Sequence, residues 1–131
     1  MKGIEVAAAV IIRGDKGNRE LLATQRGHGN YKGYWEFPGG QIEAGETARE
    51  ALTREIREEL DIEILIDRFF YHVEFGYPEF HLSMDCYLCH IDEEPRLLEH
   101  EAAMWLPFDD LFKIKWLPAD IEVLEKLGDI K

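Results

Sequence analysis

Residues 47–60 combine a helix-start signal with an apolar stripe at helical spacing. Thr47 followed three residues later by Glu50 matches a capping box, in which the two residues satisfy each other's exposed backbone amides. Four apolar residues then define one arc of a helical wheel: Ala48, Ala51, Leu52 and Ile56. The pattern predicts a helix from about residue 48 to residue 60 that packs one side against a core.

Three glutamates of this predicted helix share one face. Glu55, Glu58 and Glu59 stand at positions i, i+3 and i+4. At about 100° per residue, Glu55 and Glu59 fall inside the apolar arc and Glu58 falls at its edge. Carboxylates this close repel one another, whereas an oxygen-rich cluster suits hard cations such as Mg2+ or Mn2+. A solvated acidic stripe is the alternative, but acids that point to the interior favour a metal site.

The net charge of the chain restricts its partners. Lysine and arginine number 15 and aspartate and glutamate 27, which gives a formal charge of -12. A protein that binds a nucleic-acid polymer normally carries a basic face, so we expect no such partner. A small phosphorylated ligand is compatible with this charge if divalent cations lie between its phosphates and the acids. Phosphate chemistry in this protein should therefore need metal.

The remaining elements indicate an α+β fold over one domain, residues 1–131. Strands are predicted at 4–13, 20–25, 34–37, 62–75, 80–91 and 102–106, with a glycine-rich loop at 27–33. A second helix should begin at Pro118 and end near Gly128. Because strands and helices are mixed without a regular βαβ repeat, we expect a mixed sheet between helices.

Two features favour a cytoplasmic protein without membrane association. The chain shows no secretory signal pattern and no apolar run of 18 residues. Cys86 and Cys89 form a lone C-x-x-C within a predicted strand, where positions three apart point to opposite faces. No second cysteine pair completes a zinc site, so we expect two unpaired thiols.

The segment from Gly40 to Ile62 resembles the 23-residue box of the Nudix hydrolases. That box has a glycine, five residues, a glutamate, seven residues, Arg-Glu, an aliphatic residue, any residue, Glu-Glu, any residue, a glycine and an aliphatic residue. The matching positions are Gly40, Glu46, Arg54, Glu55, Ile56, Glu58, Glu59 and Ile62. Asp61 replaces the box glycine, which ends the helix with a positive φ; aspartate tolerates this conformation better than most residues.

The resemblance extends beyond the box over almost the whole chain. The segments 21–26, 35–40 and 117–120, together with Glu99 six residues before Trp105, look like the MutT branch, and most like its CTP pyrophosphohydrolase members. The resemblance implies a Nudix-type α/β/α sandwich with a mixed central sheet. It also implies metal-assisted attack of water on a phosphorus of a nucleoside diphosphate linked to another group.

The resemblance assigns the metal and the catalytic chemistry to glutamates. The implied ligands of Mg2+, or of Mn2+, are Glu55, Glu58, Glu59, the carbonyl of Gly39, and Glu99. Glu58 or Glu59 would also hold or deprotonate the attacking water, and Glu99 is a further ligand or base; an ordinary surface acid is the alternative for Glu99. Gly40 is structural, and Glu46 and Arg54 should pair to brace the loop against the helix.

The resemblance also implies a second set of residues, which bind the substrate: Arg26, Glu36, Phe37, Pro38, Gly39 and Asp120. For Arg26 the alternative is an ordinary strand-end arginine, and for Asp120 it is complementation of a helix dipole. An ionised Asp120 only accepts hydrogen bonds, which suits the N4 amino group of cytosine. The O6 acceptor of 8-oxoguanine would repel it. Phe37 is expected to stack on the base or to pack beside it.

The resemblance implies metal-dependent hydrolysis of a nucleoside triphosphate, CTP, dCTP or a modified nucleotide, to a nucleoside monophosphate and pyrophosphate. The first alternative is another nucleoside diphosphate derivative: 8-oxo-dGTP, ADP-ribose or a nucleotide sugar. The second is a catalytically silent module that senses a nucleotide, although such a module should lose box glutamates and all are present here. The partner is a small nucleotide, and the chain acts as a monomer or a homodimer.

Overall fold

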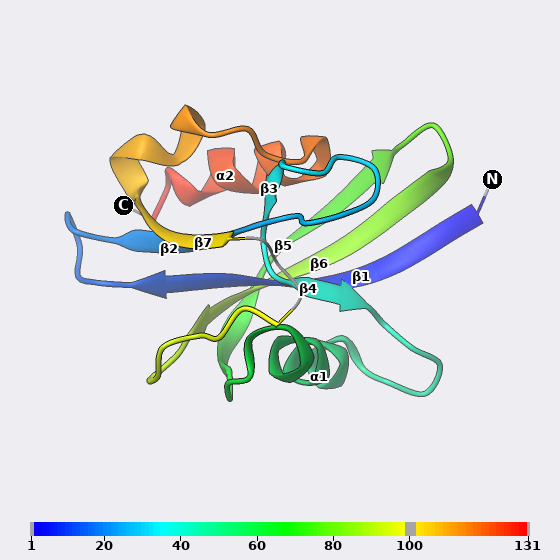
Figure 1. The fold of residues 1–131 in the computed structure, drawn as a ribbon, viewed down its shortest axis with the longest axis horizontal. Coiled ribbons are helices and arrows are strands. Elements are labelled where there is room, and N and C mark those ends of the chain that lie inside the picture. The colour runs from blue at the N-terminus through cyan, green and yellow to red at the C-terminus, as the bar shows by residue number, and fades with distance from the viewer. Residues whose placement is uncertain (1, 99–101, 131) are drawn as a thin grey trace.

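The computed structural model, which describes residues 2–98 and 102–130, has a mixed sheet between two α-helices (Figure 1). The strands are β1 (Lys2–Arg13), β2 (Glu20–Gln25), β3 (Trp35–Glu36), β4 (Gly39–Gln41), β5 (Leu65–Gly76), β6 (Phe80–His90) and β7 (Ala102–Pro107). The helices are α1 (Ala48–Leu60) and α2 (Ile121–Leu127), with the 3-10 helices η1 (Phe108–Lys113) and η2 (Pro118–Asp120). The predicted α+β fold, with helices on both sides of a mixed sheet, is confirmed.

One edge of β1 pairs with two different strands, β4 and β2. The candidate site lies where the pairing changes from one strand to the other. The strand order is β3-β2-β1-β6-β5, with β4 also paired to β1 and β7 to β2. β1 runs parallel to β6 along one edge. On its other edge, Val6 to Ala8 pair with β4, whereas Ile12 and Arg13 pair with β2. Between these two pairings the segment 37–38 crosses from β3 to β4, and Ala9 donates its N–H to the Pro38 carbonyl at 2.8 Å.

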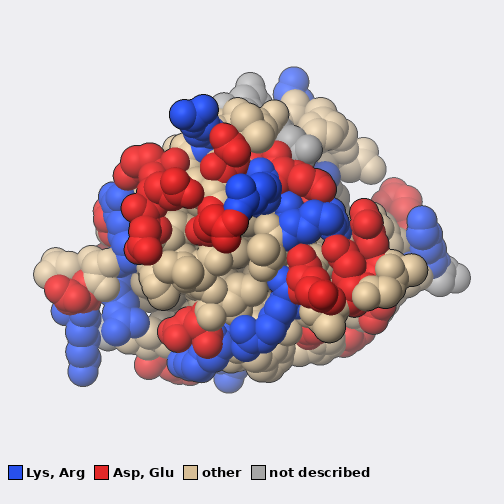
Figure 2. All heavy atoms as spheres, turned by 90° about the horizontal axis from the view of Figure 1, so that it is seen from below, with Lys and Arg blue, Asp and Glu red and all other residues tan. Residues whose placement is uncertain are grey.

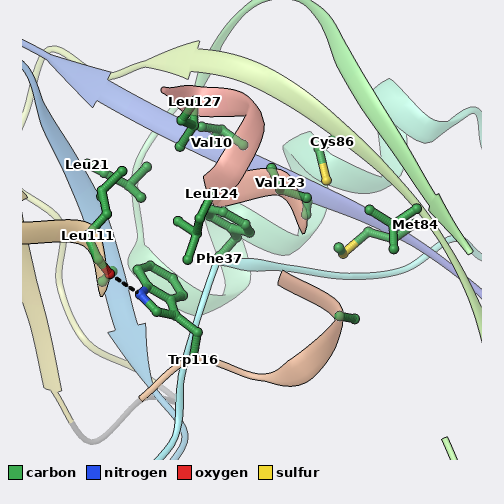
Figure 3. Close-up of a cluster of buried hydrophobic side chains, with 14 of the residues drawn as sticks. Val10, Leu21, Phe37, Met84, Cys86, Leu111, Trp116, Val123, Leu124 and Leu127 are labelled. Carbon is green, nitrogen blue, oxygen red and sulfur yellow. Dashed lines mark hydrogen bonds between the residues drawn. The ribbon is translucent and has the colours of Figure 1, made fainter. Parts of the chain in front are cut away.

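Alternate residues of β1 point to opposite faces of the sheet and contribute to the hydrophobic core on each side. Ala8 and Val10 face α2, and Ala7, Ala9 and Ile11 face α1. On the α2 side the aromatic centre is the pair Phe37 and Trp116, whose indole N–H donates to the Leu111 carbonyl at 2.7 Å (Figure 3). The α1 side is closed by Leu52, Ile56 and Leu60, which are fully buried.

Local signals set the two ends of α1 as the sequence predicts. Glu50 donates its N–H to Oγ1 of Thr47 at 3.1 Å, and Thr47 donates its N–H to Oε1 of Glu50 at 2.9 Å. The helix ends at Asp61, which has φ 56° and ψ 41°. The capping box is confirmed, and so is the positive φ at the position where the Nudix box has glycine.

Three boundaries differ from the prediction. The strand predicted over 62–75 begins at Leu65, because the left-handed Asp61 turns the chain and Ile62 and Ile64 pack against α1 without pairing. β1 begins two residues before the predicted 4–13, since its parallel pairing with β6 already starts at Lys2. The helix predicted from residue 118 starts as the 3-10 turn η2 and becomes α-helical at Ile121.

The sequence missed β4 and η1 altogether. β4 contains two glycines and a glutamine, so no side-chain pattern marks it as a strand; only its backbone pairing with β1 does. The strand predicted over 34–37 shrinks to the two residues of β3.

The cysteine and membrane expectations can be compared with the model directly. Cys86 and Cys89 are free thiols in different cores, on opposite faces of the sheet, as predicted. Among the helices of residues 2–98 and 102–130, none is long and apolar enough to span a membrane.

Candidate active site

Two glycines let the strand β4 lie close to its neighbours. Gly39 has φ 152°, and a Cβ there would lie 2.9 Å from the Cα of Ala8 on β1. A Cβ on Gly40 would overlap the carboxylate of Glu55. Only glycine therefore fits at position 39, whereas a side chain at position 40 would displace the Glu55 carboxylate, which reaches the backbone of β4.

Glu59 connects α1 to the start of β4. Its side chain is buried, with 7% of the residue exposed, and Oε1 accepts the N–H of Gly39 at 3.0 Å. The helical wheel had placed Glu59 inside the apolar arc, and its burial confirms that position. The fold therefore holds the Glu59 carboxylate at the junction between α1 and β4.

Arg54 is the counter-charge of the acidic face. Its Nε donates to Glu46 at 2.7 Å, and its Nη1 donates to Glu55 at 2.8 Å and to Glu58 at 3.2 Å. The hydrogen bond from Arg54 is the main reason that the pKa of Glu46 falls to about 2, while the same contact raises the pKa of Arg54. Nη2 also donates to the Gln41 carbonyl at 3.1 Å, so Arg54 braces the loop before α1 against the helix.

The chemistry of the donor set fits a hard cation. Within the described ranges, no three His, Cys, Asp or Glu side chains stand together so as to hold an ion. Arg54 lies against both Glu55 and Glu58, and the Glu58 side chain is 49% exposed. Glu55 and Glu59 stand beside the backbone of β4, and both Glu55 and Glu58 would exchange their bonds to Arg54 for bonds to the ion. Carboxylates beside a backbone carbonyl are the oxygen donors that Mg2+ and Mn2+ bind.

Glu99, the remaining predicted ligand, lies outside the described residues. The segment before it is hydrogen-bonded to the end of α1. The backbone N–H of Leu98 donates to the Glu59 carbonyl at 3.0 Å, and the backbone N–H of Arg96 donates to the Leu60 carbonyl at 2.8 Å. The last described residue before Glu99 is thus hydrogen-bonded to the backbone of Glu59.

Divalent metal should stabilise the fold. An ion that binds only the native state adds RT ln(1 + [L]/Kd), about 2.7 kcal/mol at a hundredfold excess over Kd. It also relieves repulsion among Glu55, Glu58 and Glu59. We expect the melting temperature to rise by several degrees between EDTA and excess Mg2+. The shift should shrink in Glu59→Gln, and an unchanged wild-type melting temperature would count against a preformed site.

A pocket of about 390 Å3 opens on the α2 side of the sheet. Five of the six predicted substrate residues line it: Arg26, Glu36, Phe37, Gly39 and Asp120. Pro38 does not line it; its carbonyl accepts the N–H of Ala9 on β1. Gly39 belongs to the pocket and also donates to Glu59. The pocket and the acidic cluster therefore adjoin at Gly39.

Asp120 presents a buried carboxyl to this pocket. Only 3% of the residue is exposed, and Oδ2 accepts the N–H of Phe37 at 3.3 Å. Burial first, and the negative charge of Glu36 second, raise the pKa of Asp120 well above its ordinary value, against the smaller effects of the Phe37 N–H and Arg26. From the sequence this carboxyl was expected to be ionised, whereas its surroundings in the fold favour the neutral form. Asp120 makes no side-chain cap bond to α2.

Arg26 and Phe37 are both more constrained than the sequence suggested. Nη1 of Arg26 donates to Glu36 at 3.2 Å, which holds both side chains at the pocket. Phe37 is 5% exposed and its ring lies 5.3 Å from that of Trp116, so it packs in the core (Figure 3). Three further aromatic residues that line the pocket were not predicted: Tyr31, Tyr77 and Phe80. The sequence had indicated for Tyr77 only a place in the turn at 76–78.

The α1 side of the molecule is strongly charged. Acidic side chains gather there in several groups, with Lys and Arg between them (Figure 2). With a formal charge of -12, a polyphosphate that approached this face would meet repulsion unless cations lay between its phosphates and the acids.

Comparisons with known proteins agree with this geometry. The model of the NUDIX domain matches residues 3–127. The chain is 34% identical to the CTP pyrophosphohydrolase of Escherichia coli K12, over 95% of this chain and 91% of that protein. It is 33% identical to the 8-oxo-dGTP diphosphatase of the same strain, over 97% and 98%. The crystal structure of a MutT NUDIX hydrolase from Burkholderia pseudomallei has a TM-score of 0.86 and 28% identity, covering 97% of this chain and 99% of its own.

Proposed function

Because this chain belongs to the Nudix family, we propose that it hydrolyses a nucleoside triphosphate to a nucleoside monophosphate and pyrophosphate with the help of a divalent cation. One observation carries the proposal: Gly39 lines the pocket and donates its N–H to Glu59. A nucleotide whose base occupies the pocket would lead its phosphates past Gly39 to the acids of α1. The two parts of such a substrate thus have adjoining sites.

The proposed metal ligands are Glu55, Glu58, Glu59, the Gly39 carbonyl and Glu99, with Mg2+ as the ion and Mn2+ as the alternative. A cation here would neutralise phosphate charge and lower the pKa of a bound water. Of the acids, Glu59 is held by the Gly39 N–H, and Glu55 lies against Gly40. Glu58, Glu59 and Glu99 are the proposed catalytic groups, because one of them must orient or deprotonate the water.

We propose cytosine nucleotides, CTP or dCTP, as the preferred substrates. The relative in Escherichia coli named CTP pyrophosphohydrolase supports this choice, and the one named 8-oxo-dGTP diphosphatase supports the main alternative. Asp120 and its neighbours Arg26 and Glu36 are the polar groups that would meet the base or the sugar. We place the protein in the cytoplasm, where free thiols such as Cys86 and Cys89 persist.

A substrate panel tests this proposal. We expect kcat/KM with Mg2+ to be highest for CTP, dCTP or 5-methyl-dCTP, and lower for 8-oxo-dGTP and dATP, with pyrophosphate as the second product. ADP-ribose and a nucleotide sugar serve as diphosphate controls. Faster turnover of either control would replace triphosphates as the substrate class. Binding without turnover of any compound would instead identify a nucleotide-sensing module.

A further inference from the structure

Tyr77 lies in the turn between β5 and β6 and contacts residues both of its own hairpin and far away in the sequence. It is 6% exposed, and its backbone N–H donates to the Phe80 carbonyl at 2.9 Å. Its hydroxyl oxygen accepts the N–H of Ala119 at 3.2 Å. This bond joins the β5–β6 turn to η2, the 3-10 turn that carries Asp120.

The Tyr77 ring is fixed from three sides. It stacks on Phe80 with centroids 5.0 Å apart, lies 4.8 Å from Phe75, and meets Tyr31 edge to face at 5.7 Å. Tyr31 belongs to the glycine-rich loop between β2 and β3 and has φ 65°. A ring held by its own hairpin and by that loop gives its hydroxyl a defined position.

The Tyr77 hydroxyl accepts a hydrogen bond from the backbone of Ala119, the residue before Asp120. Pro118 has no N–H, so the N–H of Ala119 is the first amide that η2 presents, and Tyr77 satisfies it. On the other side, Phe37 donates its N–H to the Asp120 carboxyl. The carboxyl is therefore placed by two contacts, one from Phe37 on its side chain and one from Tyr77 on its backbone.

We propose that Tyr77 is a positioning residue for base selection, holding Asp120 at the pocket through the Ala119 amide. This inference rests on the proposed function, in which Asp120 reads the base. Burial raises the pKa of Tyr77 to about 12, so the hydroxyl keeps its proton at neutral pH. Tyr77→Phe keeps the packed ring and removes only the acceptor for the Ala119 N–H, which frees η2 to shift the carboxyl.

The test is the ratio of kcat/KM for CTP to kcat/KM for 8-oxo-dGTP, measured on one preparation so that any inactive fraction cancels. In Tyr77→Phe we expect the preference to shrink by about fivefold, as for the loss of one ordinary hydrogen bond. The change should appear in KM, with kcat for the better substrate nearly unchanged. Tyr87→Phe, the same change in a buried tyrosine on the α1 side, should leave the ratio unaltered.

The double variant Tyr77→Phe with Asp120→Asn separates the possible results. If Tyr77 acts through Asp120, its effect on the ratio should disappear once Asp120 is asparagine. Equal effects in both backgrounds would overturn the positioning role, as would an unchanged ratio in Tyr77→Phe while Asp120→Asn alone changes it. If neither single variant changes the ratio, both the positioning role and base reading by Asp120 are wrong. The proposed hydrolysis of nucleoside triphosphates would still stand.

Discussion

Glu59→Gln should lower kcat by at least about a hundredfold at saturating Mg2+, in the range of single catalytic groups. Glutamine keeps the size of the side chain, and its carbonyl still accepts the Gly39 N–H, so the fold at this junction should persist. What disappears is the negative charge that would bind the cation or the water. Steady-state rates with CTP across a Mg2+ titration measure the effect.

Two companion variants make this result specific. Glu58→Gln should cause a loss of similar size, because Glu58 is the second proposed ligand on the same face. Glu63→Gln is the matched control, since its side chain is 69% exposed just beyond α1 and pairs with Arg57. A Glu59→Gln enzyme with near wild-type kcat at saturating Mg2+ would remove Glu59 from the catalytic site, whatever the family.

The parts of the molecule that follow from local chemistry were predictable. The start of α1 depends on Thr47 and Glu50, three residues apart, and its end depends on the conformation that Asp61 tolerates. The helical wheel likewise placed Glu59 in the interior, because periodicity alone decides which side of a helix is apolar. These signals lie within a few neighbouring residues, so no knowledge of the rest of the fold is needed to read them.

The pocket could not be derived in the same way. Asp120 meets the N–H of Phe37, 83 residues away in the sequence, and Tyr77 meets Ala119, 42 residues away. The family resemblance placed Asp120 beside the base, but its ionisation depends on burial and on Glu36, which only the fold brings together. β4 was missed for a related reason, since its glycines serve close approach and carry no strand pattern.

At a pH above the pKa of Asp120, Asp120→Asn should shift selectivity towards 8-oxo-dGTP by about 1–3 kcal/mol, as for one good base contact. The N7–H donor of 8-oxoguanine lies between the O6 and O8 acceptors, so an ionised carboxylate there meets repulsion. An asparagine amide always offers both a donor and an acceptor. The N4 amino group of cytosine has one hydrogen that points away from N3, and a carboxylate accepts it without such repulsion.

The pH dependence of this selectivity distinguishes the carboxyl from the amide. Burial and Glu36 raise the pKa of Asp120 above its ordinary 3.8, so at low pH the neutral acid also offers a donor and an acceptor, and both bases fit. As pH rises through the pKa of Asp120, the wild-type ratio of kcat/KM for CTP over 8-oxo-dGTP should increase. In Asp120→Asn the same ratio should stay flat, whereas Asp129→Asn, an exposed aspartate beyond α2, should behave as wild type. If Asp120→Asn and the wild type have the same ratio at every pH, Asp120 does not read the base and the proposed preference for cytosine is wrong.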